Sequence, residues 1–187
     1  METNFFGALR CIRAVLPGMR ERKSGRIINI TSVAGRLAAA GQSAYAASKF
    51  ALEAASESLA AEVKPFNIRV NVVEPGVIET PIFGKGNDVS ADIYPGARRL
   101  NALFAASLEQ PVPASVIGGQ IRDIVAGEDW QFRHPGGPAA AGIMAWRASM
   151  TDEQYIASGA LDDDAWCDFV QKSMGLDVRR HLAPAAS

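Results

Sequence analysis

Cysteine is scarce in this sequence and long apolar runs are absent, and each absence excludes a class of protein. Among the 187 residues only Cys11 and Cys167 are cysteines. Two are too few for a disulfide framework, so we expect buried free thiols in a reducing compartment, the cytoplasm. A membrane-spanning helix needs about 20 consecutive apolar residues. The longest candidate, near the start of the chain, is interrupted by Arg10, Arg13 and Pro17, so the sequence predicts no transmembrane span.

Charge of one sign and histidine are also scarce. The sequence has 19 Lys and Arg residues against 20 Asp and Glu residues, for a formal net charge of −1. Such a balance gives no broad field to attract nucleic acid or acidic lipid. The Arg pairs at 98–99 and 179–180 are typical of solvated helix faces, and His134 and His181 fit no metal-ligand spacing. We therefore predict no metal site and no nucleic-acid or membrane partner.

What the sequence does contain is a regular change of apolar period. Long helical patterns alternate with short runs rich in Ile and Val, which is typical of helices that cover a parallel sheet. Apolar residues make up 48% of the chain, enough for one globular α/β domain with a sizeable core. The pattern predicts helices over 5–22, 43–64 and 114–127, and strands over 26–31, 68–73 and 130–134.

Local signals refine two of these segments. Pro17 is expected to kink the first helix, and the residues at 24–25, Ser and Gly, are expected to close it. The segment 82–113 is mixed in polarity and rich in Gly, Pro, Asn and Asp. Such a composition is typical of a mobile lid or of short helices.

The last third of the chain is predicted to be helical. Thr151 and Gln154 have the spacing of a capping box, and the aspartates at 162–164 favour the start of a helix that Gly175 ends. Bulky residues in this region either pack as core or line a substrate pocket or partner surface, and packing is the default. They are Met144, Trp146, Met150, Tyr155 and Trp166.

Three polar residues point to chemistry. Ser32 follows the first predicted strand, at the sheet edge where open α/β folds bind ligands. Tyr45 and Lys49 are four residues apart on the longest predicted helix, so they share a face with Cβ atoms about 5–6 Å apart. A cation beside a phenol favours the phenolate, which can act as a general acid or base. The stripe that carries them continues through Leu52, Ser56, Leu59 and Val63.

The motifs around these residues resemble the classical short-chain dehydrogenases/reductases. The order is Asn4, then Gly-Arg-Ile-Ile-Asn-Ile-Thr-Ser-Val-Ala-Gly over 25–35, Tyr-Ala-Ala-Ser-Lys over 45–49, and Asn-Val-Val-Glu-Pro-Gly over 71–76 followed by Thr80. Several motifs agree in order and spacing over about two fifths of the chain. The resemblance implies a Rossmann-like, doubly wound parallel sheet, of which this chain has the carboxyl-terminal part with about three strands.

The resemblance also implies roles for individual residues. Ser32 would polarise the substrate oxygen, Tyr45 would exchange the proton, and Lys49 would favour the phenolate while holding the nicotinamide ribose of NAD or NADP. Asn4 would position a water for proton relay. The residues that would line the nicotinamide pocket are Pro75, Gly76, Val77 and Thr80, whereas Asn71 would be structural.

One family feature is missing from the sequence. Relatives begin with a Thr-Gly-x-x-x-Gly-x-Gly turn that holds the pyrophosphate, and the glycines at 84 and 86 follow no strand and read as a loop. The chain is therefore expected to be the carboxyl-terminal part of a longer protein. We divide its single partial domain into a catalytic core over 1–81, a substrate loop over 82–113, and carboxyl-terminal helices with the last strand over 114–187.

The sequence thus predicts an NAD(P)-dependent oxidoreductase that interconverts a secondary alcohol and a ketone or aldehyde, with a lipophilic substrate as a weak hint. Two alternatives stay open: a non-catalytic interaction module that cannot hold a dinucleotide, and an epimerase or dehydratase of the same superfamily. The resemblance further implies a homodimer or homotetramer that uses the helices at 5–22 and 43–64.

Overall fold

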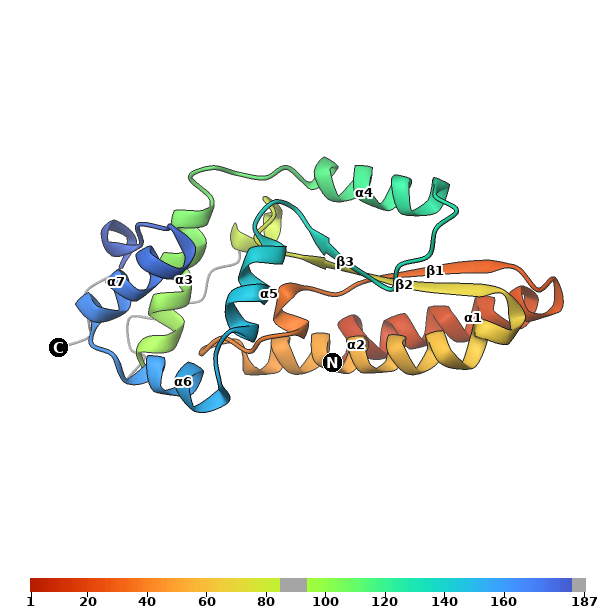
Figure 1. The fold of residues 1–187 in the computed structure, drawn as a ribbon, viewed down its shortest axis with the longest axis horizontal. Coiled ribbons are helices and arrows are strands. Elements are labelled where there is room, and N and C mark those ends of the chain that lie inside the picture. The colour runs from red at the N-terminus through yellow and green to blue at the C-terminus, as the bar shows by residue number, and fades with distance from the viewer. Residues whose placement is uncertain (85–93, 183–187) are drawn as a thin grey trace.

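The computed structural model describes residues 1–84 and 94–182 and is built around a parallel sheet. Its strands are β1 (Gly25–Ile30), β2 (Ile68–Pro75) and β3 (Arg133–Gly136), hydrogen-bonded in the order β1-β2-β3 (Figure 1). All pairs are parallel. The expected strand at 130–134 is displaced by three residues, because the chain enters the sheet only at Arg133.

Helices cover both faces of the sheet, as Figure 1 shows. On one face lie α1 (Ala8–Glu21), preceded by a π-helical turn over Glu2–Gly7, and α2 (Ser43–Val63). On the other lies α4 (Ala114–Ala126). The first layer forms a core of Ile12, Ile27, Ala60, Val63, Ile68 and Val70, and the second a core of Val73, Ile78, Ile117 and Ile124. The predicted α/β class and the Rossmann-like double winding are confirmed.

Two details of the first layer differ from expectation. The helix α1 contains Pro17 and ends at Glu21, but the left-handed residue that follows it is Lys23, with φ of 50°, and Gly25 already belongs to β1. Cys11 is exposed, because it lies on the outer side of α1, whereas Cys167 is buried as predicted. Apolar and charged residues alternate closely in this helix, so the sequence pattern alone does not show whether Cys11 faces the sheet or the solvent.

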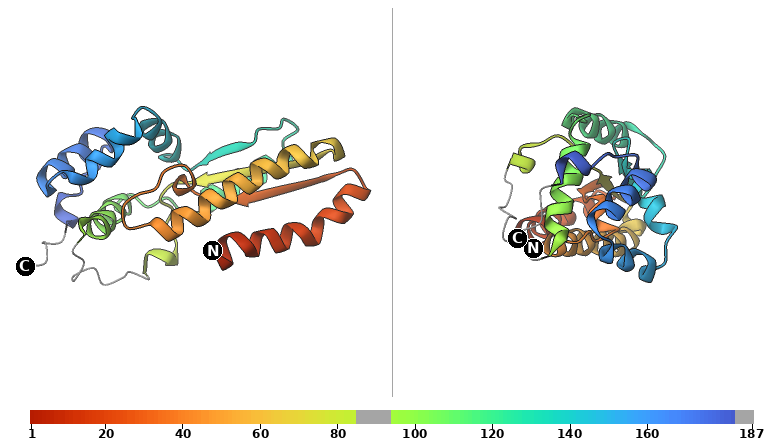
Figure 2. Two further views of the ribbon diagram at one scale, coloured as in Figure 1. Left: turned by 90° about the horizontal axis from the view of Figure 1, so that it is seen from below. Right: turned by 90° about the vertical axis from the view of Figure 1, so that its left-hand side faces the viewer.

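The carboxyl-terminal helices gather at the end of the molecule toward which the strands point (Figures 1 and 2). They are α3 (Pro95–Ser107), α5 (Ala140–Ala148), α6 (Asp152–Ala157) and α7 (Asp163–Met174). Their core includes Ala102, Ala106, Cys167, Val170 and Val178. Of the segment 82–113, the described part holds a short 3-10 turn over Pro81–Gly84 and the helix α3, whereas residues 85–93 lie outside the described residues.

The predicted helix ends of this region are present. The Thr151 side chain accepts a hydrogen bond from the Gln154 amide and Gln154 returns one, which completes the capping box of α6. Asp162 caps α7, and Gly175 ends it in the left-handed conformation with φ of 71°. Trp146 packs edge-on against Tyr155 and Phe169, so packing accounts for the aromatic residues here.

The Arg pair at 98–99 is not a solvated helix face. Arg99 is only 6% exposed, and both guanidinium groups bind the Asp163 carboxylate, with N–O distances of 2.8 and 2.9 Å. Arg99 also donates to the Leu161 carbonyl. These contacts tie α3 to the start of α7, which is why a cationic pair can lie in a helix interface.

Trp130 marks the opposite end of the sheet. Its indole N–H donates to the Val70 carbonyl at 3.0 Å, and the Lys64 ammonium lies 4.3 Å from its ring centroid. Among the described residues, no helix has both the length and the apolar character required to cross a membrane.

Candidate active site

The site is assembled at the carboxyl ends of the strands, the edge at which open parallel sheets bind ligands. Ser32 lies two residues beyond β1, and Pro75 is the last residue of β2. The two strand ends are joined because Thr31 donates to the Val73 carbonyl from both its amide, at 2.8 Å, and its hydroxyl, at 2.9 Å. The sheet therefore fixes Ser32 beside Pro75 and Gly76.

Ser32 caps the short 3-10 turn over Val33–Gly35. Its hydroxyl oxygen accepts a hydrogen bond from the Ala34 amide at 3.1 Å and donates to the Pro75 carbonyl at 3.3 Å. The residue is 8% exposed. A hydroxyl with one long hydrogen bond can exchange that partner for a ligand oxygen with little loss.

Tyr45 and Lys49 come from the first two turns of α2, on its buried side. The Lys49 ammonium donates to the Ile30 carbonyl at 2.9 Å and lies 5.7 Å from the centroid of the Tyr45 ring. Burial lowers the pKa of Lys49. Within residues 1–84 and 94–182, no hydrogen-bond partner occupies the Tyr45 hydroxyl. Two further ammonium protons and one phenol are thus available to a ligand.

Asn4 is brought to this helix from the π-helical turn before α1. Its side-chain amide donates to the Ser48 hydroxyl at 3.1 Å, and that hydroxyl donates to the Tyr45 carbonyl at 2.7 Å. The structure therefore connects Asn4 to the backbone of the turn that carries Tyr45. Sequence reasoning did not identify Ser48 as this link, and its position three residues after Tyr45 was the available signal.

The predicted pocket wall follows β2 directly. The Gly76 amide donates to the Gly136 carbonyl at 3.0 Å, which closes the end of β2 against β3. Val77 and Thr80 are half-buried, and the Thr80 carbonyl accepts a hydrogen bond from Phe83 in the next turn. Glu79, directly before Thr80, is exposed.

A buried ionic cluster next to the site was missed from the sequence. Glu53, one turn beyond Lys49, and Glu74, directly before Pro75, are 4% and 1% exposed. Both approach Arg133 of β3. A signal was present, since Glu74 follows the apolar residues Val72 and Val73 in a buried parallel strand, but its partner is distant in sequence.

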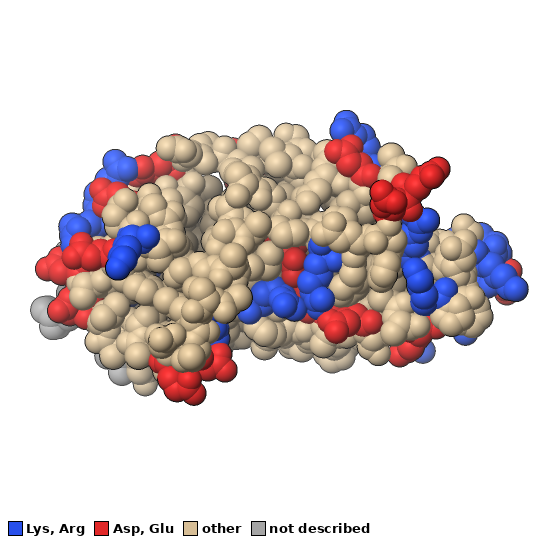
Figure 3. Space-filling model, viewed as in Figure 1, with Lys and Arg blue, Asp and Glu red and all other residues tan. Residues whose placement is uncertain are grey.

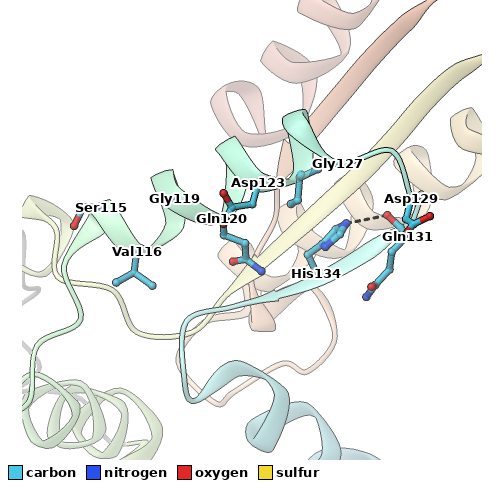
Figure 4. Close-up of a pocket in the computed structure, with 10 residues that line it drawn as sticks. Ser115, Val116, Gly119, Gln120, Asp123, Gly127, Asp129, Gln131 and His134 are labelled. Atoms are coloured by element: carbon cyan, nitrogen blue, oxygen red, sulfur yellow. Dashed lines mark hydrogen bonds between the residues drawn. The ribbon is translucent and has the colours of Figure 1, made fainter.

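An open pocket lies elsewhere, between α4 and β3 (Figure 4). It has a volume of about 580 Å³ and is lined by Gln120, Asp123, Gln131 and His134, among others. His134 is hydrogen-bonded to the Gln131 carbonyl, as the dashed line shows. None of the predicted site residues lines this pocket.

Figure 3 shows Lys and Arg atoms interspersed with Asp and Glu atoms on the face it displays.

Comparison with known proteins places the first half of the chain in a defined group. Residues 1–90 match the family model described as short chain dehydrogenase. Human retinol dehydrogenase 8 is 51% identical over 84 residues, which are 45% of this chain and 27% of that protein. The 3-ketodihydrosphingosine reductase of Bacteroides thetaiotaomicron is 51% identical over 80 residues, 43% of this chain and 30% of that protein. The chain thus matches less than a third of the length of these relatives.

Solved structures extend the similarity to most of the chain. A short-chain dehydrogenase from Streptomyces avermitilis superposes with a TM-score of 0.64 at 37% identity, covering 84% of this chain and 60% of that one. A short chain dehydrogenase from Burkholderia cenocepacia, solved in complex with NADP, gives a TM-score of 0.60 at 25% identity, covering 87% and 57%. The similarity therefore includes the carboxyl-terminal helices as well as the sheet.

Proposed function

The chain belongs to the short-chain dehydrogenase/reductase family, and from that membership we propose that it is an oxidoreductase that interconverts a secondary alcohol and a ketone or aldehyde with NAD or NADP. One observation carries the proposal: the Lys49 ammonium lies 5.7 Å from the centroid of the Tyr45 ring and donates to the Ile30 carbonyl, two residues before Ser32, at the carboxyl edge of the sheet. A phenol, an ammonium and a hydroxyl at that edge are the groups needed to handle a carbonyl or alcohol oxygen.

In the proposed reaction, Tyr45 moves the proton. For alcohol oxidation its phenolate oxygen accepts the hydroxyl proton while a hydride leaves the adjacent carbon, and for reduction the phenol returns the proton. Ser32 donates a hydrogen bond to the same oxygen. The Lys49 ammonium, 5.7 Å from the centroid of the Tyr45 ring, would stabilise the phenolate formed in this step by its charge.

The residues present fit the nicotinamide end of a dinucleotide. Lys49 uses one N–H on the Ile30 carbonyl and retains others for a ribose hydroxyl. We propose that Pro75, Gly76, Val77 and Thr80 form the wall beside it. NAD(P) supplies the hydride acceptor or donor when it is bound. The described residues include no glycine-rich strand–turn–helix for the pyrophosphate.

The substrate, assembly and location are further parts of the proposal. The names of the retinol and 3-ketodihydrosphingosine relatives support a lipophilic alcohol or ketone. The helix α3 follows the site wall in the chain, and we propose that this helix of the predicted substrate loop faces the substrate. Val15 on α1 and Phe50 on α2 are 47% and 43% exposed, which supports a homodimer or homotetramer through these helices. Neither cysteine is in a disulfide, which supports a cytoplasmic location.

Titration of the full chain with NADH and NADPH, followed by cofactor fluorescence, tests the proposal. We expect saturable binding that Lys49→Ala weakens by at least about 10-fold, since a buried charge-assisted contact is worth about 1.5–3 kcal/mol. Tyr45→Phe should retain binding and lower turnover of alcohols by about 10²–10⁴-fold. Lys64→Ala, which removes a surface ammonium from Trp130, serves as the matched control.

Each alternative has its own outcome. Absence of binding at millimolar cofactor would contradict the enzyme and support the interaction module. An epimerase would be supported instead if the cofactor binds and the configuration of the alcohol changes, but no alcohol gives net reduction of the bound oxidised cofactor.

A further inference from the structure

Two carboxyl groups are buried directly behind the proposed site. Glu53 lies on α2 one turn beyond Lys49 and is 4% exposed, and Glu74 lies on β2 directly before Pro75 and is 1% exposed. Removing a carboxylate from water is costly unless it is paired or takes up a proton. The charged groups around Glu53 and Glu74 therefore decide whether each carboxyl group is paired with a cation or keeps a proton.

Arg133 stands between the two carboxyl groups. Its Nε lies 3.3 Å from a Glu53 oxygen and 3.7 Å from a Glu74 oxygen, and its terminal nitrogen binds the exposed Glu57. Arg36, whose side chain is 46% exposed, comes only to 4.0 Å from Glu74. The Arg133 guanidinium group thus lies near three carboxyl groups, and the second cation, Arg36, is farther away. The cluster has more acidic groups than close cations.

The hydrogen bonds also leave the two carboxyl groups incompletely paired. Among the described residues, the Oε1 atoms of both Glu53 and Glu74 are buried and have no hydrogen-bond partner. The Glu74 Oε1 is the atom that faces Arg133 and Arg36, at 3.7 and 4.0 Å, too far for a hydrogen bond. Burial, and next the charge of Glu53, raise the pKa of Glu74, and the opposing effects of Arg36 and Arg133 are smaller. A buried carboxyl group with a free oxygen, beside a second one, is the arrangement in which one proton is retained.

The cluster contacts the elements that carry the site. The Pro75 carbonyl, next in chain to Glu74, accepts the Ser32 hydrogen bond. Gly35, which ends the turn begun by Ser32, lies so close to α2 that a Cβ there would be 2.9 Å from Glu53 Cγ and 3.2 Å from the Lys49 carbonyl. The Ser32 turn therefore rests on Glu53 and Lys49, and its other side is bonded to the strand end that Glu74 anchors.

We propose that Glu53 and Glu74 hold one proton between them and that this pair, clamped by Arg133, positions the Ser32 turn against the helix of Tyr45 and Lys49. The positioning role rests on the proposed function, whereas the shared proton does not. Neither carboxyl group touches substrate in this proposal, so both are positioning residues.

The shared proton is tested by thermal unfolding of the full chain, without cofactor, between pH 5 and pH 9. Because the folded-state pKa of Glu74 is raised, the folded chain keeps a proton that the unfolded chain has released above about pH 4.3. Stability is therefore lost as the pH rises through the folded pKa. We expect the melting temperature to fall with pH in the unmodified chain and much less in Glu74→Gln, whose amide mimics the protonated acid.

Glu57→Gln is the matched control, because it removes the exposed carboxylate on the same guanidinium. It should keep the pH dependence of the unmodified chain. Parallel melting profiles for Glu74→Gln and the unmodified chain would overturn the shared proton, and Glu53→Gln provides a second variant should Glu74→Gln fold poorly.

The positioning role needs a readout at the site itself. With ¹³Cζ-labelled tyrosine, the Tyr45 signal should move in Glu74→Ala and stay in place in Glu57→Gln. Where the chain turns over substrate, Glu74→Ala should lower kcat at least about 10-fold with little change in KM, and Glu74→Gln should restore it at neutral pH. An unmoved Tyr45 signal overturns the positioning role, whereas lack of cofactor binding by the unmodified chain contradicts only the proposed function.

Discussion

The sheet half and the helical half of the molecule are held together by different contacts. In the sheet half, strands are covered on both faces, and Val72 and Val73 of β2 are 0% exposed. In the helical half, half-buried aromatic rings and the ion pairs of Asp163 join α3, α5 and α7. All three groups of the proposed chemistry belong to the sheet half. The proposed reacting groups are therefore held by a sheet that is buried on both faces, whereas side-chain contacts between helices build the neighbouring half.

The largest effect on stability is expected in the sheet core. Ile68, 1% exposed at the start of β2, packs between α1, α2 and β1. Ile68→Ala should lower the free energy of unfolding by about 2–5 kcal/mol, because it removes methyl groups and leaves a cavity. Urea unfolding followed by far-UV circular dichroism measures this change. Ile156→Ala, at a position 73% exposed on α6, is the control and should change stability by less than about 0.5 kcal/mol.

The ion pairs between α3 and α7 come next. Burial raises the pKa of Asp163, but the hydrogen bonds and charges of Arg98 and Arg99 outweigh it and leave that pKa lowered. The stabilisation is therefore present above the unfolded pKa of about 3.9 and is lost as the pH falls through the folded value. The Asp163 side chain is 37% exposed, so solvent screening limits the loss in Asp163→Asn to about 1 kcal/mol at pH 7.

Unfolding of Asp163→Asn at pH 7 and at pH 3 checks this expectation. The difference from the unmodified chain should shrink at the lower pH, because the aspartate of the unfolded chain is mostly protonated there and part of the stabilisation is lost. A loss that is equal at both pH values would show that the contact acts through packing and not through charge.

An effect of similar size but confined to one short helix is expected at the capping box of α6. Thr151→Ala removes the side-chain oxygen that accepts from the Gln154 amide, and such a cap is worth about 1 kcal/mol. Amide hydrogen exchange should become faster in 152–157 and remain unchanged in β2. Faster exchange in both regions would contradict the view that the two halves are stabilised separately.

The sequence predicts the sheet half better than the helical half. The period of apolar residues locates β1, α2 and β2 within one or two residues, because each is buried along a continuous face. The strand at 133–136 is short and contains Pro135, so its pattern is weak. The burial of Arg99 depends on Asp163, a partner distant in sequence, which no local period can show.

In the candidate site, too, the features that follow from local sequence pattern are predictable, and those that depend on tertiary packing are not. The approach of Lys49 to Tyr45 is predictable because the two residues share a helix face, and the place of Ser32 at the sheet edge is predictable because it follows a strand. The contact from Asn4 to Ser48 and the burial of Glu53 against Arg133 arise only from tertiary packing. Their residue types were visible in the sequence, but their partners were not.

The positions of the tryptophan residues allow fluorescence to report on the sheet half and on the helical half separately. Trp130 is joined to β2 by its N–H and covered by the Lys64 ammonium, far from the helices that contain Trp146 and Trp166. Because Trp130 is 39% exposed, its emission should lie to the red of theirs. Replacing the other two indoles by phenylalanine would leave one fluorophore that reports only on the end of the sheet remote from the substrate edge.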